Sequence, residues 1–493
     1  MIIYHLPILQ IIIPLIAAPI VIIIRNAYWS WLFSLLVTWI SFFISIALLV
    51  KVITDGFVLY SLGGWDAPWG IEYRIDVLNG FGLVIVSAKG AVVMPYAKIS
   101  IQFEVSKDRI YLFYSMLLLC LTGLLGITIT GDAFNLFVFL EISSLSSYVL
   151  ISMGKDKRSL TAAYRYLIMG TIGATFYVIG VGLMYMMTGT LNIYDLAQIM
   201  PSISSSRTIQ AALAFLTVGL CLKIALFPLH MWLPSSYAYA PSVVTIFLAA
   251  TATKVSVYAL IRVVFTIFGG IDLLGTLVVR DFLLVLSIIG MIAASFVAIY
   301  QENIKRLLAY SSVAQVGYII LGISINNTTS VAAGIIHLFN HALIKGGLFM
   351  VMGIIMYQIG SVRLAHIAGL GKKIPLTMAC FVAGGFALIG IPLSTGFVSK
   401  WYLIQGAIEE DWWPLSIVIG FTSLLAVVYI WKIVEVAYFQ QPVEKDCVIK
   451  KAPISMVLPM ILLIAASYYF GIDSKLTMNI ALSAADSLMS ISE

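Results

Sequence analysis

Charged side chains are scarce in this sequence. Only 10% of its 493 residues are Asp, Glu, Lys or Arg, against about 25% in soluble proteins. Hydrophobic residues make up 61%, above the roughly 45–50% of soluble domains. Water cannot solvate such a surface, so the apolar side chains must face lipid or one another. The shortage of charge therefore excludes a soluble domain and predicts an integral membrane protein.

Cysteine is also rare, and the pattern of a metal or redox site is missing. No Cys-x-x-Cys motif and no His/Cys ligand spacing occurs, so we expect no metal, no cofactor and no redox chemistry on this chain. The basic residues are scattered between apolar runs, without a cluster interleaved with aromatics, so nucleic acid is not an expected partner. The four cysteines lie far apart, at Cys120, Cys221, Cys380 and Cys447.

Long apolar runs are abundant instead. A membrane-spanning helix needs about 20 mostly apolar residues, and fourteen runs satisfy this requirement. The sequence thus predicts an all-α integral membrane protein of about 14 transmembrane helices. The predicted spans are residues 7–25, 29–50, 77–97, 110–130, 133–153, 161–188, 209–234, 242–266, 281–300, 305–325, 330–358, 375–406, 412–440 and 453–471.

The charges in the connecting loops alternate along the chain. Lys and Arg gather after the first, third, fifth, ninth, eleventh and thirteenth spans, for example at Lys157 and Lys372. The intervening loops contain mainly acids, for example Glu72 and Glu409. Basic loops tend to remain in the cytoplasm. We therefore predict that both termini lie outside the cytoplasm, as an even number of spans requires.

Two parts of the chain share the same spacings. Sixteen residues separate Asp132 from Tyr148, and sixteen separate Glu302 from Tyr318. Coincidence is the alternative to a true repeat. Because each repeat would contain five helices, an odd number, the two units must be inverted, which is an architecture of transporters. The predicted organisation is three N-terminal helices in residues 1–107, repeats in 108–268 and 280–440, and a C-terminal helix and tail in 441–493.

Two prolines interrupt long apolar runs at corresponding places in these units. Pro228 follows Phe227, and Pro392 lies between two glycines, Gly390 and Gly396. Proline removes a backbone hydrogen bond and breaks or kinks a helix, and freed carbonyls in a bilayer are tolerated only against protein or water. A simple kink would explain either proline alone. Together they favour two discontinuous helices that line an ion site.

Several ionisable residues lie inside the predicted spans, where each costs at least a few kcal/mol. Glu141, Lys223, Lys254 and Lys400 are each surrounded by apolar sequence, and Glu141 is the only acid in its run. A buried lysine loses its preference for the charged form, and an adjacent carboxylate restores it. A lysine and a carboxylate can therefore form a switchable pair that takes up and releases a proton. These four residues are candidates for proton transfer.

The eleventh span contains a stripe of titratable groups. His337, His341 and Lys345 follow one another at intervals of four, so they share one face of a helix. Histidine titrates near neutral pH and can pass protons between lysines. His230 lies seven residues after Lys223, on nearly the same face of a continuous helix, although a packing role is its alternative.

Two further basic residues receive other roles. Lys89 lies in the third span about two turns from its inner end, and we expect its long side chain to extend to the membrane interface. Arg262 lies near a span end and is expected to meet lipid headgroups.

Three motifs resemble a known family. These are ITGDAFNLFVFLE at residues 129–141, KIALFPLHMWLP at 223–234 and GFVSKW at 396–401. They are similar to the proton-translocating antiporter-type subunits of complex I and of Mrp cation/proton antiporters, and the resemblance covers about residues 75–440. The wording of the first motif, and a chain that stops after the fourteenth span, are most similar to the D-type subunit of Mrp antiporters.

The resemblance implies roles for the candidate residues. Glu141 would pair with Lys223, Lys254 would be the central lysine, and His337 and His341 would relay protons to a second half-channel. Lys400 matches a site that is Lys in some subunits and Glu in others, and Lys fits the D-type subunit. His230, Lys345 and the breaks at Pro228 and Pro392 complete the candidate site.

The function implied is that of a proton-translocating subunit of a multisubunit sodium/proton antiporter in the inner membrane of a prokaryote. Its partners would be other membrane subunits of the complex, the lipid bilayer, protons and sodium. Two alternatives remain. The first is the homologous proton-pumping subunit of complex I or of a membrane-bound hydrogenase, in which electron transfer elsewhere drives the same relay. The second is a structural subunit that conducts nothing, which would tolerate alanine at Glu141 and Lys223.

Overall fold

A computed structural model describes residues 2–269, 274–441 and 449–490 of the chain. Helices dominate this part, and thirteen of them are long and apolar enough to cross a membrane. The predicted class, an all-α integral membrane protein, is confirmed. The predicted span 375–406 is divided into two shorter helices, α16 and α17.

The elements follow the predicted groups. The N-terminal group has α1 (Leu6–Ile24), α2 (Ala27–Asp55) and α3 (Val77–Glu104). Next come α4 (Ile110–Ile129), α5 (Ala133–Ser152), α6 (Arg158–Thr188), α7 (Ile193–Ile203), α8 (Arg207–Ile224), α9 (Trp232–Tyr239), α10 (Ser242–Ala250) and α11 (Ala252–Ile261). The remainder is α12 (Leu274–Ile299), α13 (Ile304–Ile325), α14 (Thr328–Ile359), α15 (Leu370–Lys373), α16 (Pro375–Ile389), α17 (Thr395–Glu409), α18 (Trp413–Phe439), α19 (Ile454–Ile472) and α20 (Lys475–Met489).

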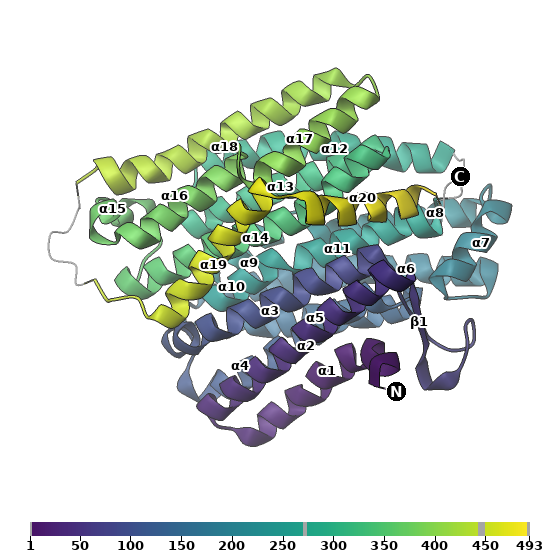
Figure 1. Cartoon of the computed structure of the whole chain (residues 1–493), viewed down its shortest axis with the longest axis horizontal. Coiled ribbons are helices and arrows are strands. Elements are labelled where there is room, and N and C mark those ends of the chain that lie inside the picture. The colour runs from purple at the N-terminus through teal and green to yellow at the C-terminus, as the bar shows by residue number, and fades with distance from the viewer. Residues whose placement is uncertain (1, 270–273, 442–448, 491–493) are drawn as a thin grey trace.

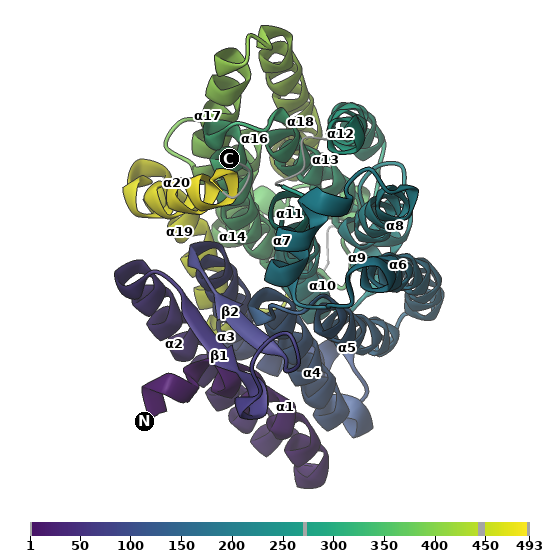
Figure 2. The ribbon, with the colours of Figure 1, turned by 90° about the vertical axis from the view of Figure 1, so that its right-hand side faces the viewer.

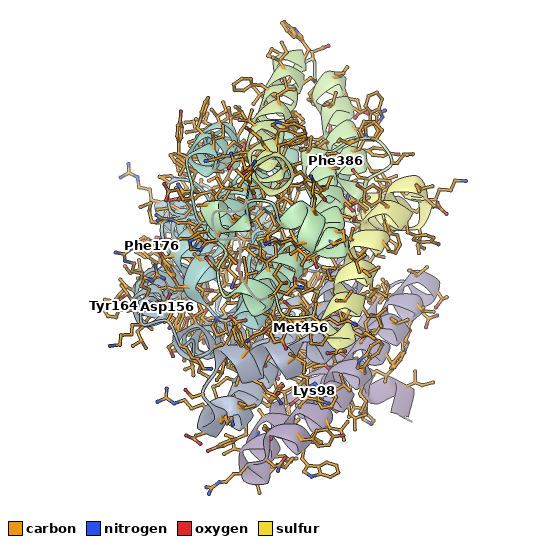
Figure 3. All side chains as sticks on the ribbon, turned by 90° about the vertical axis from the view of Figure 1, so that its left-hand side faces the viewer. Lys98, Asp156, Tyr164, Phe176, Phe386 and Met456 are labelled. Carbon is orange, nitrogen blue, oxygen red and sulfur yellow. The ribbon has the colours of Figure 1, made fainter. Side chains whose placement is uncertain are left out.

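The long helices run side by side along one direction (Figure 1). Both termini lie at one end of the bundle with the β-hairpin and α7, whereas α15 lies at the opposite end. Views from the two ends show the N-terminal helices at one edge and α17 and α18 at the other (Figures 2 and 3). The middle of the bundle is formed by α10, α11, α13 and α14, and the spanning part of α13 is completely buried.

Polar caps define where several helices begin. The Asp76 side chain accepts a hydrogen bond from the Asn79 amide at the start of α3, and Asn79 returns one to the Asp76 amide. Asp132 caps α5, and Asn303 caps α13 through the Arg306 amide at 3.1 Å. Such caps satisfy amides that have no partner within the helix. They explain why the chain turns sharply at these polar residues between apolar runs.

The same backbone pairing occurs in both predicted repeats. The turn at Asp132, before α5, forms a bridge with Asn192, after α6. The turn at Asn303, before α13, forms a bridge with Arg363, after α14. Sixty residues separate the partners in each case (192 − 132 and 363 − 303). This alignment pairs Asp132 with Asn303, one residue beyond the expected match with Glu302. The inverted repeat stays a prediction, which this pairing supports.

Three elements and one helix break were not predicted. The elements are the antiparallel hairpin of β1 (Val58–Ser61) and β2 (Glu72–Ile75), the short helix α7, and α20 after the last span. The break lies at Thr251, where φ is −127° and ψ is −59°, and it divides the predicted span 242–266 into α10 and α11. No proline or glycine lies there, so the sequence contains no local signal for it. A π-helical turn, Arg262–Ile267, follows α11.

Candidate functional site

The structure brings Glu141 and Lys223 together in the first half of the chain. Glu141 lies on α5 and Lys223 in the last turn of α8, and Lys223 Nζ is 3.3 Å from Glu141 Oε1. Lys223 Nζ also donates to Ser144 Oγ at 2.7 Å. Ser144 is one turn from Glu141 on the same face of α5. The lysine is almost fully buried, whereas 24% of the Glu141 side chain is exposed.

The predicted break at Pro228 is confirmed. Helix α8 ends at Ile224, the next residue Ala225 has a positive φ of 61°, and α9 begins at Trp232. The indole N–H of Trp232 donates to the Leu222 carbonyl at 2.9 Å. The aromatic side chain thus satisfies a backbone group that the break sets free, as a membrane interior requires.

His230 lies within this break, so it does not share a helical face with Lys223. That expectation was wrong, because it assumed a continuous helix. The imidazole stacks on Phe227, with ring centroids 5.3 Å apart, and meets Tyr310 edge-on at 6.0 Å. Its Nδ1 has no hydrogen-bond partner in the described part of the chain.

Lys254 lies in the first turn of α11, directly after the break at Thr251. Its ammonium donates to the Ala249 carbonyl, and at 3.3 Å to the hydroxyl of Thr253. The lysine is 4% exposed. A helix break therefore supplies the carbonyl acceptor that a buried ammonium needs.

The predicted stripe on α14 is buried along its length. His337 Nδ1 lies 2.7 Å from Ser399 Oγ on α17, and its Nε2 lies 3.0 Å from Gln315 Oε1 on α13. The His341 ring is nearly parallel to that of His337, with centroids 6.1 Å apart. Neither nitrogen of His341 has a hydrogen-bond partner among the described residues. Lys345 donates to the Leu308 carbonyl at 2.8 Å and to the Ser311 hydroxyl.

The predicted break at Pro392 is also confirmed, and Lys400 lies next to it. Helix α16 ends at Ile389, Gly390 has a φ of 90°, and α17 begins at Thr395. Lys400 Nζ donates to the Ile389 carbonyl at 2.8 Å and to Ser423 Oγ at 2.9 Å. The carbonyl that the break leaves free is thus an acceptor for the buried ammonium.

Lys89 does not reach the membrane interface. It is 3% exposed, and its Nζ has no hydrogen-bond partner in the described residues. The expectation that it extends to the interface was wrong. The long side chain can extend only if its own helix faces lipid at that turn, and here α3 packs against α10, α14 and α19.

Arg262 does not meet headgroups either. It is 3% exposed, and its Nη2 donates to both carboxylate oxygens of Asp76, at 2.6 and 2.5 Å, and to Asn79 Oδ1. Tyr258 accepts a further hydrogen bond from its Nε at 3.1 Å. The π-helical turn after α11 directs this arginine inward, so that it joins α11 to the start of α3.

A cavity of about 420 Å³ opens at the end of the bundle near α15. Charged side chains from four segments line it, among them Glu104, Lys155 and Lys305. Lys305 is 3% exposed and donates to Ser242 Oγ at 2.9 Å, and Glu104 Oε2 accepts from the Ser242 amide at 2.8 Å. The cavity thus reaches the beginnings of α10 and α13, whose interiors adjoin the central lysines.

Sequence reasoning identified the charged residues but missed their partners. Ser144, Ser311, Ser399 and Ser423 each contact a titratable group, and Gln315 holds His337. Serine in an apolar helix more often bonds its own backbone, so these residues had no distinctive signal. No group of three or more His, Cys, Asp or Glu side chains in residues 2–269, 274–441 and 449–490 is placed to hold a metal ion.

A bundle with buried lysines and histidines at helix breaks defines a class of polytopic membrane proteins. The chain belongs to the family described as the transmembrane region of NADH:quinone oxidoreductase and Mrp antiporter subunits, which matches residues 130–426. This finding confirms the resemblance noted in the three motifs.

Relatives occur on both branches of this family. The chain is 44% identical over 382 residues to NADH-quinone oxidoreductase subunit N of Desulforudis audaxviator, covering 77% of this chain and 75% of that one. It is 30% identical to the D-type subunit of the Na⁺/H⁺ antiporter of Alkalihalophilus pseudofirmus, covering 90% and 89%. A chain of the archaeal membrane-bound sulfane sulfur reductase superimposes with a TM-score of 0.90 at 29% identity, covering 99% and 98%.

Proposed function

We propose that this chain translocates protons as one membrane subunit of a multisubunit sodium/proton antiporter. The observation behind this proposal is the series of buried ionisable groups that crosses the bundle, from Glu141 and Lys223 through Lys254 and the α14 stripe to Lys400. Hydrocarbon does not tolerate such groups without a purpose, and each has at its side a hydroxyl, a carbonyl or another titratable group.

The charge balance of this series favours proton movement. Its members include four lysines and two histidines but one carboxylate, Glu141. Several ammonium groups cannot all be charged in a low-dielectric interior without strong repulsion. Some of the lysines must therefore be neutral at any moment, and the protons redistribute when one is added or removed. Separation of Glu141 from Lys223 would remove the countercharge and send a proton toward Lys254.

Access from the cytoplasm would come through the 420 Å³ cavity. Lys305 lies at its inner end and on α13, one turn before Leu308, whose carbonyl accepts from Lys345. A proton that enters this cavity would therefore meet the central part of the series without crossing lipid. The inverted repeat would place a related route on the opposite side of the membrane in the other half.

A second candidate is the proton-pumping subunit of a redox complex. The 44% identity to a subunit N favours it, and so does the structural likeness to a chain of a respiratory membrane complex. In that case the same residues would move protons, while electron transfer on other subunits would supply the energy. Either function requires other membrane subunits as partners, whereas a structural subunit would need none of the buried groups.

The two candidates are separated by what drives proton movement. We would place the whole complex in inverted membrane vesicles, establish a pH gradient by ATP hydrolysis and add sodium without an electron donor. An antiporter should dissipate the gradient within the mixing time of a transport assay. If the gradient collapses only when an electron donor and a quinone are supplied, the antiporter proposal is wrong and the redox pump replaces it.

The topology provides an independent test. We propose that the α15 end is cytoplasmic and that both termini lie outside. In a Cys447→Ser background, a membrane-impermeant maleimide added to intact cells should label Lys475→Cys and spare Lys157→Cys; both positions are exposed. Permeabilised cells should label both, which controls for reactivity. The opposite pattern in intact cells would contradict the orientation and the cytoplasmic role of the cavity.

A further inference from the structure

The side chain of Lys89 on α3 is the one buried lysine that the pathway above leaves unused. Its Nζ lies against α14: a Cβ built on Gly346 would be 3.5 Å from it and 3.9 Å from the Cβ of Ala250. Gly346 directly follows Lys345 in the chain. A glycine at this position leaves the space that the ammonium occupies.

The same neighbourhood contains the central lysine. Ala250 directly follows Ala249, whose carbonyl accepts from Lys254. Lys254 is within electrostatic range of both Lys89 and Lys345. Three amines from α3, α11 and α14 therefore surround the break between α10 and α11. No carboxylate bonds to any of them in the described part of the chain.

The other elements packed against Lys89 add no countercharge. Helices α4, α10 and α19 contain no Asp, Glu, Lys or Arg. On α14 the titratable neighbours are His341 and Lys345. Lys51 on α2 is half-buried, and Lys475 and Asp486 on α20 are exposed. An ammonium at Lys89 would thus be uncompensated, which is costly in a membrane interior.

We propose that Lys89 is a further proton-binding site of the pathway, and that its proton alternates with that of Lys254. Because no acid neutralises the group, a charge on Lys89 repels a charge on Lys254, and only one of the two is charged at a time. A proton that arrives on Lys89 therefore drives the proton of Lys254 onward to the α14 stripe. This inference rests on the proposed proton translocation.

The experiment compares three variants of the assembled complex in the transport assay over a range of pH. Lys89→Met preserves length and suits the apolar surroundings. It should lower transport several-fold and shift its pH profile to higher pH, because the repulsion on Lys254 is removed. For charges on adjacent helices about 8–10 Å apart, at an effective dielectric constant of about 20, the shift is on the order of one pH unit.

Lys89→Arg tests the alternation itself, because arginine stays charged. It should also lower transport, but shift the profile to lower pH. Lys98→Met, on the same helix, is the matched control, since the Lys98 ammonium lies 4.4 Å from the centroid of the Trp31 ring and outside the pathway. It should change neither rate nor profile.

Unchanged rate and profile in Lys89→Met would overturn the proposal. If that variant does not assemble, Lys89→Arg decides: full transport with an unchanged profile shows that Lys89 serves as a fixed structural cation. The proposed function fails separately, when Glu141→Gln transports normally. Loss of transport in Glu141→Gln together with normal transport in Lys89→Met would exclude only the role of Lys89.

Discussion

Replacement of Glu141 by Gln should lower transport at least about tenfold while the complex still assembles. The substitution removes the carboxylate 3.3 Å from Lys223 Nζ. A buried charge that loses its partner becomes strongly unfavourable, so Lys223 can no longer hold a proton in that position. Gln has the size of Glu, and Ser144 still faces the lysine, so packing is preserved. Dissipation of a preformed pH gradient in inverted vesicles measures the effect.

The control for this prediction is Glu435→Gln. Glu435 lies on α18 with its side chain exposed, and the same loss of one negative charge there should leave transport unchanged. A native gel verifies that both variants assemble. Full transport in the assembled Glu141→Gln complex would remove the switchable pair from the mechanism, and with it the distinction from a structural subunit.

Replacement of His341 by Gln should interrupt proton transfer between the two halves. The stripe from His337 to Lys345 spans two turns, about 12 Å, of a hydrocarbon core about 30 Å thick. His341 lies in its middle, between a histidine held by Ser399 and Gln315 and a lysine held by Leu308. We expect exchange to fall about tenfold or more, because Gln cannot titrate near neutral pH.

A packing role predicts a different result for the same variant. Gln is similar in size to His and can still form hydrogen bonds, so a packing histidine should accept it. Neither ring nitrogen of His341 bonds to protein in the described residues, which argues against a structural hydrogen bond as its purpose. His366→Gln is the matched control, because His366 is exposed near α15 and its ring bonds to Ser361, outside the pathway. Undiminished exchange in assembled His341→Gln would lead us to abandon the lateral route.

Similarity alone does not choose between the two branches of the family. Lys400 and the wording of the first motif pointed to the D-type subunit of Mrp antiporters, yet the relative with 44% identity is a subunit N. The residues that move protons serve both branches, because a buried proton path needs the same chemistry whatever supplies the energy. The sodium assay without an electron donor addresses the part of the function that the pathway residues share.

The sequence by itself determined the class of protein, the spans, the two proline breaks and most of the titratable groups. These features are local: the length and composition of an apolar run decide whether it crosses a membrane, and proline breaks a helix wherever it stands. The Glu141–Lys223 pair followed from the family motifs rather than from spacing. Its geometry required α5 and α8 to pack in a particular rotation.

The tertiary structure alone decided which basic residues are inside and what they contact. Lys89 and Arg262 looked like residues that reach the membrane surface, yet both are buried. Whether a long side chain can reach the interface depends on what covers its helix, and neighbouring helices decide that. The break at Thr251 and the partners of His337 and Lys400 have the same origin. Each depends on contacts between segments far apart in the chain, which no local pattern records.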